Sequence, residues 1–237
     1  MNNSTTSAAE QEKAMRQYYR FHAAIYDATR WVFLFGRNRI LSFLPQIPAQ
    51  TLVEVGCGTG RNLQKIAKKH KGWNLIGIDV SPEMLHQASK RTEAFSHQVL
   101  LLKNPYGSST FRLQEPVDIV LFSYALTMFN PGWEAAIEQA WEHLKPGGRI
   151  AVVDFHDTPF AWFRRWMGYN HVRMDQHLLP VLENRFHLIA KDVCLGWCGL
   201  WRYFLYVGEK NATPQPSGNH SPTIHPSTLP IGNLIST

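Results

Sequence analysis

The chain has 237 residues, 44% of them hydrophobic and 18% charged, a composition that allows one ordinary globular domain with tails. Three cysteines exclude a disulfide-stapled secreted scaffold, and no stretch approaches the roughly 20 apolar residues of a membrane-spanning helix. The net charge of +6 favours anionic partners, but Lys and Arg form no long block, which argues against a nucleic-acid partner.

The two ends of the chain are expected to be disordered. Residues 1–9 are mostly Ser, Thr, Asn and Ala, and residues 211–237 contain five prolines and no Asp, Glu, Lys or Arg. Such segments bury too little apolar surface to offset the entropy of ordering. A single domain over residues 10–210 is therefore predicted.

The first part of this domain is aromatic and basic. No Pro or Gly interrupts residues 10–35, which predicts a helix, and Pro45 and Pro48 close the segment, so residues 10–48 are expected to form a helical cap. Tyr19 and Tyr26 lie about two helical turns apart and would share one face.

Apolar strands and amphipathic helices then alternate along the chain. Strands are predicted at 51–55, 74–79, 99–102, 118–122 and 149–154, with helices at 62–70, from 82 onward (capped by Ser81), and at 133–144. This alternation predicts a mostly parallel sheet with helices on both faces. Two further strands, at 186–193 and 201–207, are joined by a short glycine-containing turn, which predicts an antiparallel hairpin at the edge.

A glycine-rich loop separates the first predicted strand from the helix that follows it. Gly56, Gly58 and Gly60 would let the backbone turn sharply and approach a ligand closely. Asp79 follows about 20 residues later, at the end of the second strand, where a carboxylate can accept both hydroxyls of a ribose. A dinucleotide fingerprint would need a glycine where Arg61 stands, which disfavours a dehydrogenase.

The spacing G-x-G-x-G, with Glu54 two residues before the first glycine, resembles motif I of the class I S-adenosylmethionine-dependent methyltransferases. The turn at 144–148 (Leu-Lys-Pro-Gly-Gly) is similar to the one before strand five in that family. The resemblance implies an α/β, Rossmann-like seven-stranded sheet of order 3-2-1-4-5-7-6 with strand 7 antiparallel. It also implies a cofactor-binding half over residues 50–155 and a substrate-side insertion with the last strands over 156–210.

The same resemblance implies S-adenosylmethionine as cofactor and S-adenosylhomocysteine as product. Glu54 and the glycine loop would seat the methionine part, and Asp79 the ribose. The residues expected around the cofactor are Glu54, Gly56, Cys57, Gly58, Gly60, Asp79, Val80, Asn104, Phe122 and Ser123. After strand three the family usually has an acidic residue near the adenine. This chain has Asn104 and Tyr106 there, and either could contact the ring.

Four segments resemble a narrower group, the bacterial betaine-lipid N-methyltransferases: residues 19–37, 122–129, 152–155 and 170–173. This resemblance implies successive methylation of the amine of a diacylglyceryl homoserine head group. Because aromatic faces hold quaternary ammonium ions, Tyr124, Tyr19 and Tyr26 are the candidate acceptor walls. His156 is the candidate base, although the proton could also pass to water. No residue spacing indicates a metal site.

A lipid acceptor would require contact with a membrane surface. Arginines interleaved with aromatic residues occur at Arg16, Arg20, Arg30, Arg37 and Arg39, near Trp31, Phe33 and Phe35, and again at residues 162–166. We therefore expect a cytoplasmic protein that contacts the inner face of the cell membrane peripherally. Two other functions stay open: a methyltransferase for a small molecule, such as a small amine, or for a quinone, and a non-catalytic module that only binds S-adenosylmethionine.

Overall fold

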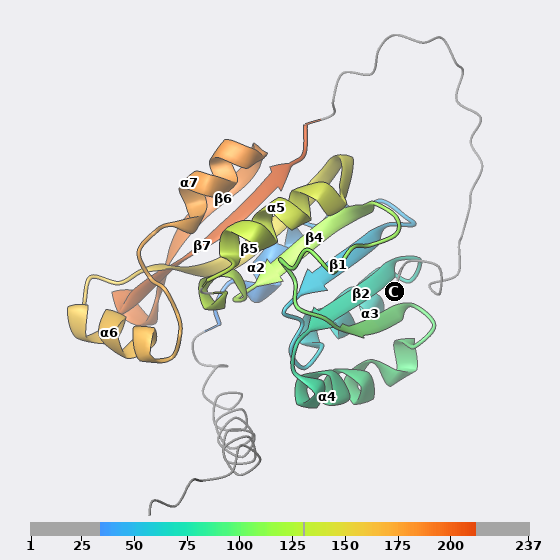
Figure 1. Ribbon diagram of the computed structural model, residues 1–237, viewed down its shortest axis with the longest axis horizontal. Helices are drawn as coiled ribbons and strands as arrows, with labels where there is room; N and C mark the ends of the chain where they lie inside the picture. The colour runs from blue at the N-terminus through green and yellow to red at the C-terminus, as the bar shows by residue number, and fades with distance from the viewer. Residues whose placement is uncertain (1–33, 130, 212–237) are drawn as a thin grey trace, which may run out of the picture. The chain divides into compact units, whose positions relative to one another are not determined.

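The computed structural model describes residues 34–129 and 131–211. The chain divides at Gly36 into two units, and the second of them holds the whole sheet. Its seven strands are β1 (Thr51–Val55), β2 (Asn74–Asp79), β3 (Val99–Lys103), β4 (Val117–Ser123), β5 (Leu144–Asp157), β6 (His187–Gly196) and β7 (Trp201–Glu209) (Figure 1).

The strand order is β3-β2-β1-β4-β5-β7-β6, which confirms the predicted topology. The five strands from β3 to β5 are parallel, and β7 runs antiparallel to both β5 and β6. Because all parallel strands end at one edge of the sheet, the loops that follow them meet there. That edge is where the glycine loop and Asp79 lie.

The described helices are α2 (Arg37–Ser42), α3 (Arg61–Lys69), α4 (Pro82–Thr92), α5 (Trp133–His143), α6 (Ala161–Tyr169) and α7 (Leu178–Arg185). Short 3-10 turns complete the list: η1 (Glu93–Phe95), η2 (Leu126–Met128) and η3 (Trp197–Gly199). Helix α4 begins as predicted, since the hydroxyl of Ser81 accepts a hydrogen bond from the amide of Met84 and Pro82 occupies the first helical position.

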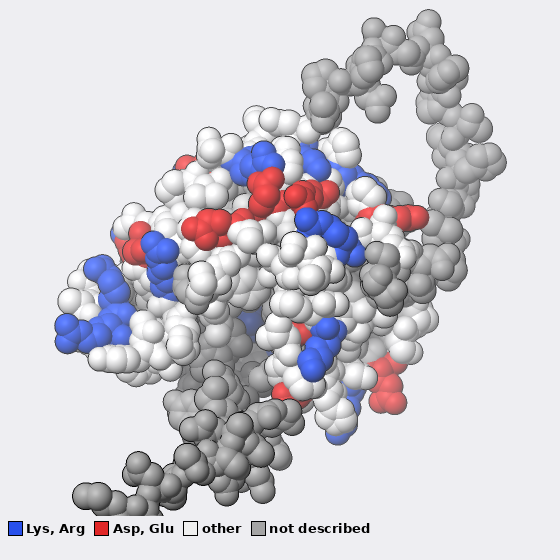
Figure 2. Space-filling view, in the orientation of Figure 1, with Lys and Arg blue, Asp and Glu red and all other residues white. Residues whose placement is uncertain are grey.

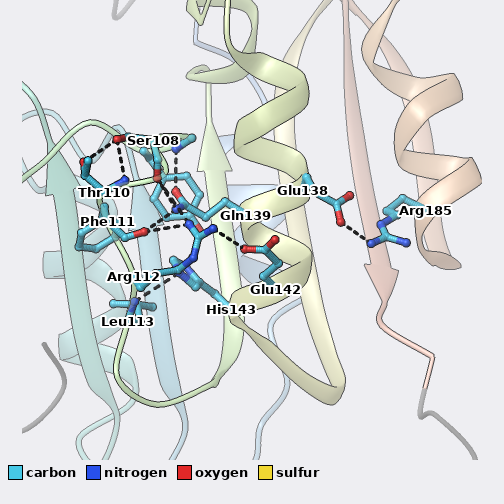
Figure 3. A network of polar contacts seen from close by, with 12 residues as sticks. Ser108, Thr110, Phe111, Arg112, Leu113, Glu138, Gln139, Glu142, His143 and Arg185 are labelled. Carbon is cyan, nitrogen blue, oxygen red and sulfur yellow. Dashed lines mark hydrogen bonds and ion pairs between the residues drawn. The ribbon is translucent and has the colours of Figure 1, made fainter. Parts of the chain in front are cut away.

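Helices α5 and α7 cover one face of the sheet and form the main core with residues such as Phe122, Val152 and Phe204. Polar side chains fix α5 to the segment before β4 (Figure 3). The side-chain oxygen of Gln139 accepts from the amide of Gly107, and its NH2 group donates to the Phe111 carbonyl at 2.6 Å. The amide of Leu113 donates to His143 Nε2 at 3.3 Å. These bonds hold the chain that leads into β4.

Three expectations differ from the structure. Strand β5 begins at Leu144 rather than Arg149, because Leu144 already pairs with Val117 and residues 145–148 bulge out opposite Asp118. Within residues 34–48 the cap is helical over Arg37–Ser42, with Gly36, at φ 78°, as the N-cap of this helix. The substrate-side insertion contains two helices, α6 and α7. Tyr19, Tyr26 and both predicted disordered tails lie outside the described residues, apart from Asn211.

Candidate functional site

The three glycines of the loop after β1 have two different surroundings. A Cβ atom at Gly56 would lie 2.8 Å from the Cβ of Ala125, and one at Gly60 would lie 3.0 Å from the Cβ of Ala88. Gly58 has φ 52°, yet a Cβ there would meet no atom within 4 Å. The first and third glycines therefore permit close packing, and of the three only Gly58 borders open space.

Asp79 ties the end of β2 to this loop. Its carboxylate accepts hydrogen bonds from the amide of Gly58 at 2.8 Å and from the amide of Ser81 at 2.9 Å. Gly56 and Cys57 both donate their amides to the carbonyl of Ile78 on the same strand. The predicted pairing of the glycine loop with Asp79 therefore exists as direct contacts at the carboxyl edge of the sheet.

The loop after β4 reaches the same place. Phe122 pairs with Val55 in register, and the contact between Ala125 and Gly56 brings the two loops together. Tyr124, which lies between Phe122 and Ala125 in the sequence, has φ 57°, a left-handed conformation that is rare for a tyrosine. Its ring is 1% exposed and packs edge-on against Phe155, with 4.8 Å between ring centroids. Strain at this position is stored beside the candidate ligand site.

Glu54 is the buried acid of the site. It is 2% exposed, and its Oε1 accepts a hydrogen bond from Asn62 at 2.7 Å. The other oxygen, Oε2, is buried and has no hydrogen-bond partner among the described residues. Burial raises the pKa of Glu54 to about 7, although Asn62 and the positive charge of Arg37 oppose the rise. The site thus holds a carboxyl group that a nearby cation would ionise.

The other predicted cofactor residues lie near this edge with different exposures. Cys57 and Phe122 are buried, so only their backbones can face a ligand, while Val80 is 63% exposed beside Asp79. Ser123 is buried, and its hydroxyl has no hydrogen-bond partner within the described chain. Asn104 donates its amide to the Asp79 carbonyl at 3.2 Å.

Tyr106 occupies the core and not the edge. It is 8% exposed, its ring contacts Phe111 and Phe122, and its hydroxyl lies 3.0 Å from His143 Nδ1. Of the two candidates for the adenine contact, Asn104 is the one that lies beside Asp79. The sequence did not indicate that the Tyr106 ring is buried, because the residue follows a proline and carries a polar hydroxyl.

A buried carboxylate on β5 organises the loop after β4. Asp154 is fully buried and accepts hydrogen bonds from the hydroxyl and amide of Thr127 and from the amide of Phe155. Burial raises its pKa to about 6, against the effect of these hydrogen bonds. Asp154 therefore positions η2, which begins two residues after Tyr124.

His156 is placed less favourably for contact with Tyr124. Its ring contacts Phe204 of the main core at 6.0 Å between centroids, whereas Tyr124 contacts Phe155. Burial lowers the pKa of His156, so the imidazole is neutral near pH 7, and its buried Nδ1 has no hydrogen-bond partner among the described residues. The neutral imidazole of His156 could accept a proton. Its ring contact is Phe204, however, whereas the ring of Tyr124 packs against Phe155.

One charge at the site is not evident from the sequence. The sequence suggests a membrane-surface role for Arg37, yet its charge opposes the rise that burial causes in the pKa of both Glu54 and Tyr124. Arg39 forms an ion pair with Asp192 at 2.6 Å. These two arginines of the expected N-terminal patch therefore interact with groups of the sheet domain. Only the packing of α2 on the sheet could reveal this, since the residues are far apart in the sequence.

Metal ligation and membrane crossing find no support among the described residues. No three His, Cys, Asp or Glu side chains in the described part of the chain lie close enough together to hold a metal ion. Of the helices in that part, none has the length and apolar character needed to cross a bilayer.

Comparison with known proteins is consistent with this geometry. Residues 53–150 match a family described as a methyltransferase domain. The chain is 30% identical over 145 residues to trans-aconitate 2-methyltransferase of Deinococcus radiodurans, covering 61% of this chain and 48% of the relative. It is 28% identical over 166 residues to demethylmenaquinone methyltransferase of Tropheryma whipplei, covering 65% of this chain and 66% of the relative. The chain thus spans about half to two thirds of these relatives.

A solved structure shares the fold. N-methyltransferase NodS from Bradyrhizobium japonicum, in complex with S-adenosyl-L-homocysteine, superposes with a TM-score of 0.62 and 22% identity, covering 76% of this chain and 86% of that one. The family match, the strand order and the glycine loop joined to Asp79 lead to one conclusion. Residues 53–150 form a methyltransferase domain, and the sheet that contains them has the strand order of the class I S-adenosylmethionine-dependent methyltransferase fold.

Proposed function

We propose that this protein transfers methyl groups from S-adenosylmethionine to the amine of a lipid head group, with diacylglyceryl homoserine as the acceptor implied by the resemblance. The observation that carries the methyltransferase part is the open space in front of Gly58, bordered by Asp79 and by the buried Glu54. A loop built only for packing would place protein atoms against Gly58, as it does against Gly56 and Gly60.

The residues at this edge fit the cofactor. Gly58 leaves room for a ligand, Asp79 offers carboxylate oxygens for ribose hydroxyls, and the unpartnered Oε2 of Glu54 suits a positively charged amino-acid end. When bound, S-adenosylmethionine supplies a methyl group on a sulfonium. The protein must orient an acceptor nitrogen toward it, keep that nitrogen neutral, and receive the proton released as the new C–N bond forms.

Tyr124 supports an amine as acceptor. It directly precedes Ala125, whose Cβ lies against Gly56, and an aromatic face stabilises the positive charge that accumulates as an amine is methylated. Phe155, which also belongs to a segment resembling the betaine-lipid enzymes, packs against this ring. His156 or water receives the proton, since the lowered pKa of His156 leaves it neutral near pH 7.

Cofactor affinity is expected to depend on pH through Glu54. In the free protein burial raises the pKa of Glu54 to about 7, and the ammonium group of the cofactor would favour its ionised form. Binding below pH 7 must then expel a proton, so affinity should fall about tenfold from pH 8 to pH 6. Calorimetric titration in buffers of different ionisation enthalpy measures both the affinity and the proton released.

Glu54→Gln should bind more weakly at pH 8 and lose most of this pH dependence. Glu142→Gln is the matched control, since Glu142 pairs with Arg112 on the surface of α5 and should leave the pH dependence unchanged. A wild-type affinity that does not change between the two pH values would contradict a role for Glu54 in binding the cofactor.

A second acceptor class has its own support. The two curated relatives described above are named for trans-aconitate and demethylmenaquinone, a small acid and a quinone. A quinone or a small molecule is therefore the alternative acceptor. The third alternative is a module that binds S-adenosylmethionine without turnover.

One experiment separates these alternatives. The full chain is incubated with S-adenosylmethionine labelled on the methyl group and with diacylglyceryl homoserine, a demethylated quinone or trans-aconitate in turn. Label in mono-, di- and trimethylated lipid supports the proposal. Label only in the quinone or the acid refutes the lipid acceptor and keeps the methyltransferase. Cofactor binding by calorimetry with no label transferred to any acceptor favours the binding module.

A further inference from the structure

Helix α6 presents large aromatic side chains to solvent. Trp162, Trp166 and Tyr169 are 64%, 47% and 79% exposed, and their spacing of four and three residues puts them on one side of the helix. Phe160, just before the helix, is 43% exposed and its ring lies 6.3 Å from that of Trp162. We call these four residues the α6 aromatic face. A solvent-facing helix surface is normally polar, so this exposed aromatic area indicates a surface that binds another molecule.

The helix is fixed to the sheet by its opposite side. Phe163 and Met167 are buried, and the Phe163 ring stacks on Trp201 of β7 at 5.8 Å between centroids. The hydroxyl of Thr158, just before α6, donates to the carbonyl of Leu200 at 2.7 Å. These contacts use the inner side of α6, so the aromatic face is held outward by the fold.

The charge around this face is positive. Arg164 and Arg165 are exposed on α6, and no Asp or Glu occurs from residue 158 to residue 174. Figure 2 shows blue Lys and Arg side chains gathered where α6 lies. Elsewhere exposed arginines have carboxylate partners, such as Arg112 with Glu142 at 3.1 Å. Within the described part of the chain neither arginine of α6 forms such an ion pair, although Arg164 donates a hydrogen bond to the carbonyl of Thr158 at 2.7 Å. Neither positive charge is therefore neutralised by a carboxylate there, and both can attract an anionic surface.

We propose that the α6 aromatic face, with Arg164 and Arg165, docks the protein on an anionic phospholipid bilayer. Trp, Tyr and Phe insert favourably at the boundary between head groups and acyl chains, and arginines beside them attract acidic head groups. A protein partner would suit the aromatic residues equally well. The paired arginines without nearby acids favour the acidic lipid surface.

Helix α6 lies close in the chain to the edge of the sheet that carries the candidate site. The helix follows the carboxyl end of β5 after three residues, 158–160, at the same edge of the sheet as the glycine loop and Asp79. Docking through α6 would bring that edge to the membrane that contains the acceptor. In this respect the inference rests on the proposed lipid acceptor, but binding to vesicles is measured without cofactor or turnover.

The test is co-sedimentation of the full chain with vesicles of phosphatidylcholine, with and without phosphatidylglycerol. We expect binding to the anionic vesicles at low salt, and weakening at roughly 0.5 M salt, where surface charges are screened. The double variant Trp162→Ser, Tyr169→Ser should lose about tenfold or more in affinity because it removes the exposed apolar area. Arg165→Glu should lose about tenfold, mostly at low salt.

Two matched controls replace similar groups elsewhere. Ile47→Ser removes an apolar side chain that is 54% exposed, and Lys71→Glu makes the same charge change on an exposed loop. Both should bind vesicles like the wild type. Equal losses in the controls, equal binding to neutral vesicles, or an unchanged affinity of the α6 variants would each overturn the proposal. The proposal would also be overturned if the α6 variants bound vesicles normally but changed their oligomeric state in sedimentation velocity, because the aromatic face would then be a protein interface.

Failure of this test and failure of the proposed function look different. If the lipid acceptor is wrong, vesicle binding persists while no label enters diacylglyceryl homoserine. If only the docking surface is wrong, the α6 variants methylate detergent-dispersed lipid at the wild-type rate and bind vesicles like the wild type.

Discussion

Gly58→Ala is expected to reduce S-adenosylmethionine affinity between about tenfold and about a hundredfold, because the new methyl group enters the space where the cofactor would lie. No atom of the protein lies within 4 Å of that methyl position, so the substitution causes no steric clash in the free protein. The positive φ of 52° should still lower the free energy of unfolding by roughly 1 kcal/mol.

Gly147→Ala provides a control with the same backbone chemistry. Gly147 has φ 76°, and a Cβ atom at this position would also meet no atom within 4 Å, but the residue lies in the bulge at 145–148, at the other edge of the sheet. Chemical denaturation should show similar destabilisation of both variants, and calorimetry should show a loss of cofactor affinity for Gly58→Ala alone. Similar cofactor affinities of the two variants would mean that the glycine loop does not contact the cofactor.

Tyr124→Leu should lower kcat/KM for the amine acceptor about thirtyfold, because a desolvated cation above an aromatic face is worth about 2 kcal/mol or more. Tyr124→Phe keeps the ring and the packing against Phe155, so we expect it to stay within about threefold of the wild type. Both variants retain a Cβ atom at the left-handed position, so the backbone strain at φ 57° is unchanged. Cofactor affinity should be the same in all three proteins.

Removing a buried ring also lowers the free energy of unfolding. A substitution of a second buried tyrosine, away from the site, serves as the control for this effect. Tyr206 of β7 is fully buried and donates its hydroxyl to the carbonyls of Leu182 and Phe186, within the main core. Tyr206→Leu should lose roughly 2 kcal/mol or more of unfolding free energy while keeping kcat/KM. If Tyr124→Phe is as slow as Tyr124→Leu, the hydroxyl and not the ring face contributes to the reaction.

Much of the fold was predictable because its signals are local. The strands at 51–55 and 74–79 agree with β1 and β2, since buried parallel strands are short apolar runs bounded by turns. The glycine spacing and Asp79 were predicted to bind the cofactor, and the hydrogen bond from the Gly58 amide to the Asp79 carboxylate brings these residues together. The antiparallel hairpin of β6 and β7 followed from the short turn between them.

The tertiary structure decided the features that depend on distant segments. The pairing of Arg39 with Asp192, the action of Arg37 on Glu54, and the burial of Tyr106 beside His143 all join residues that no periodicity connects. Which aromatic side chains of α6 face the solvent could not be predicted from the sequence, because Phe163 and Trp162 are both apolar, yet Phe163 is buried and Trp162 is exposed. The chain of amino acids alone determined which segments become strands and where the backbone turns at Gly58, since these are set by residue type and spacing. Which charges meet and which rings face outward was decided by the packing of helices on the sheet, because burial and long-range electrostatics exist only in the folded chain.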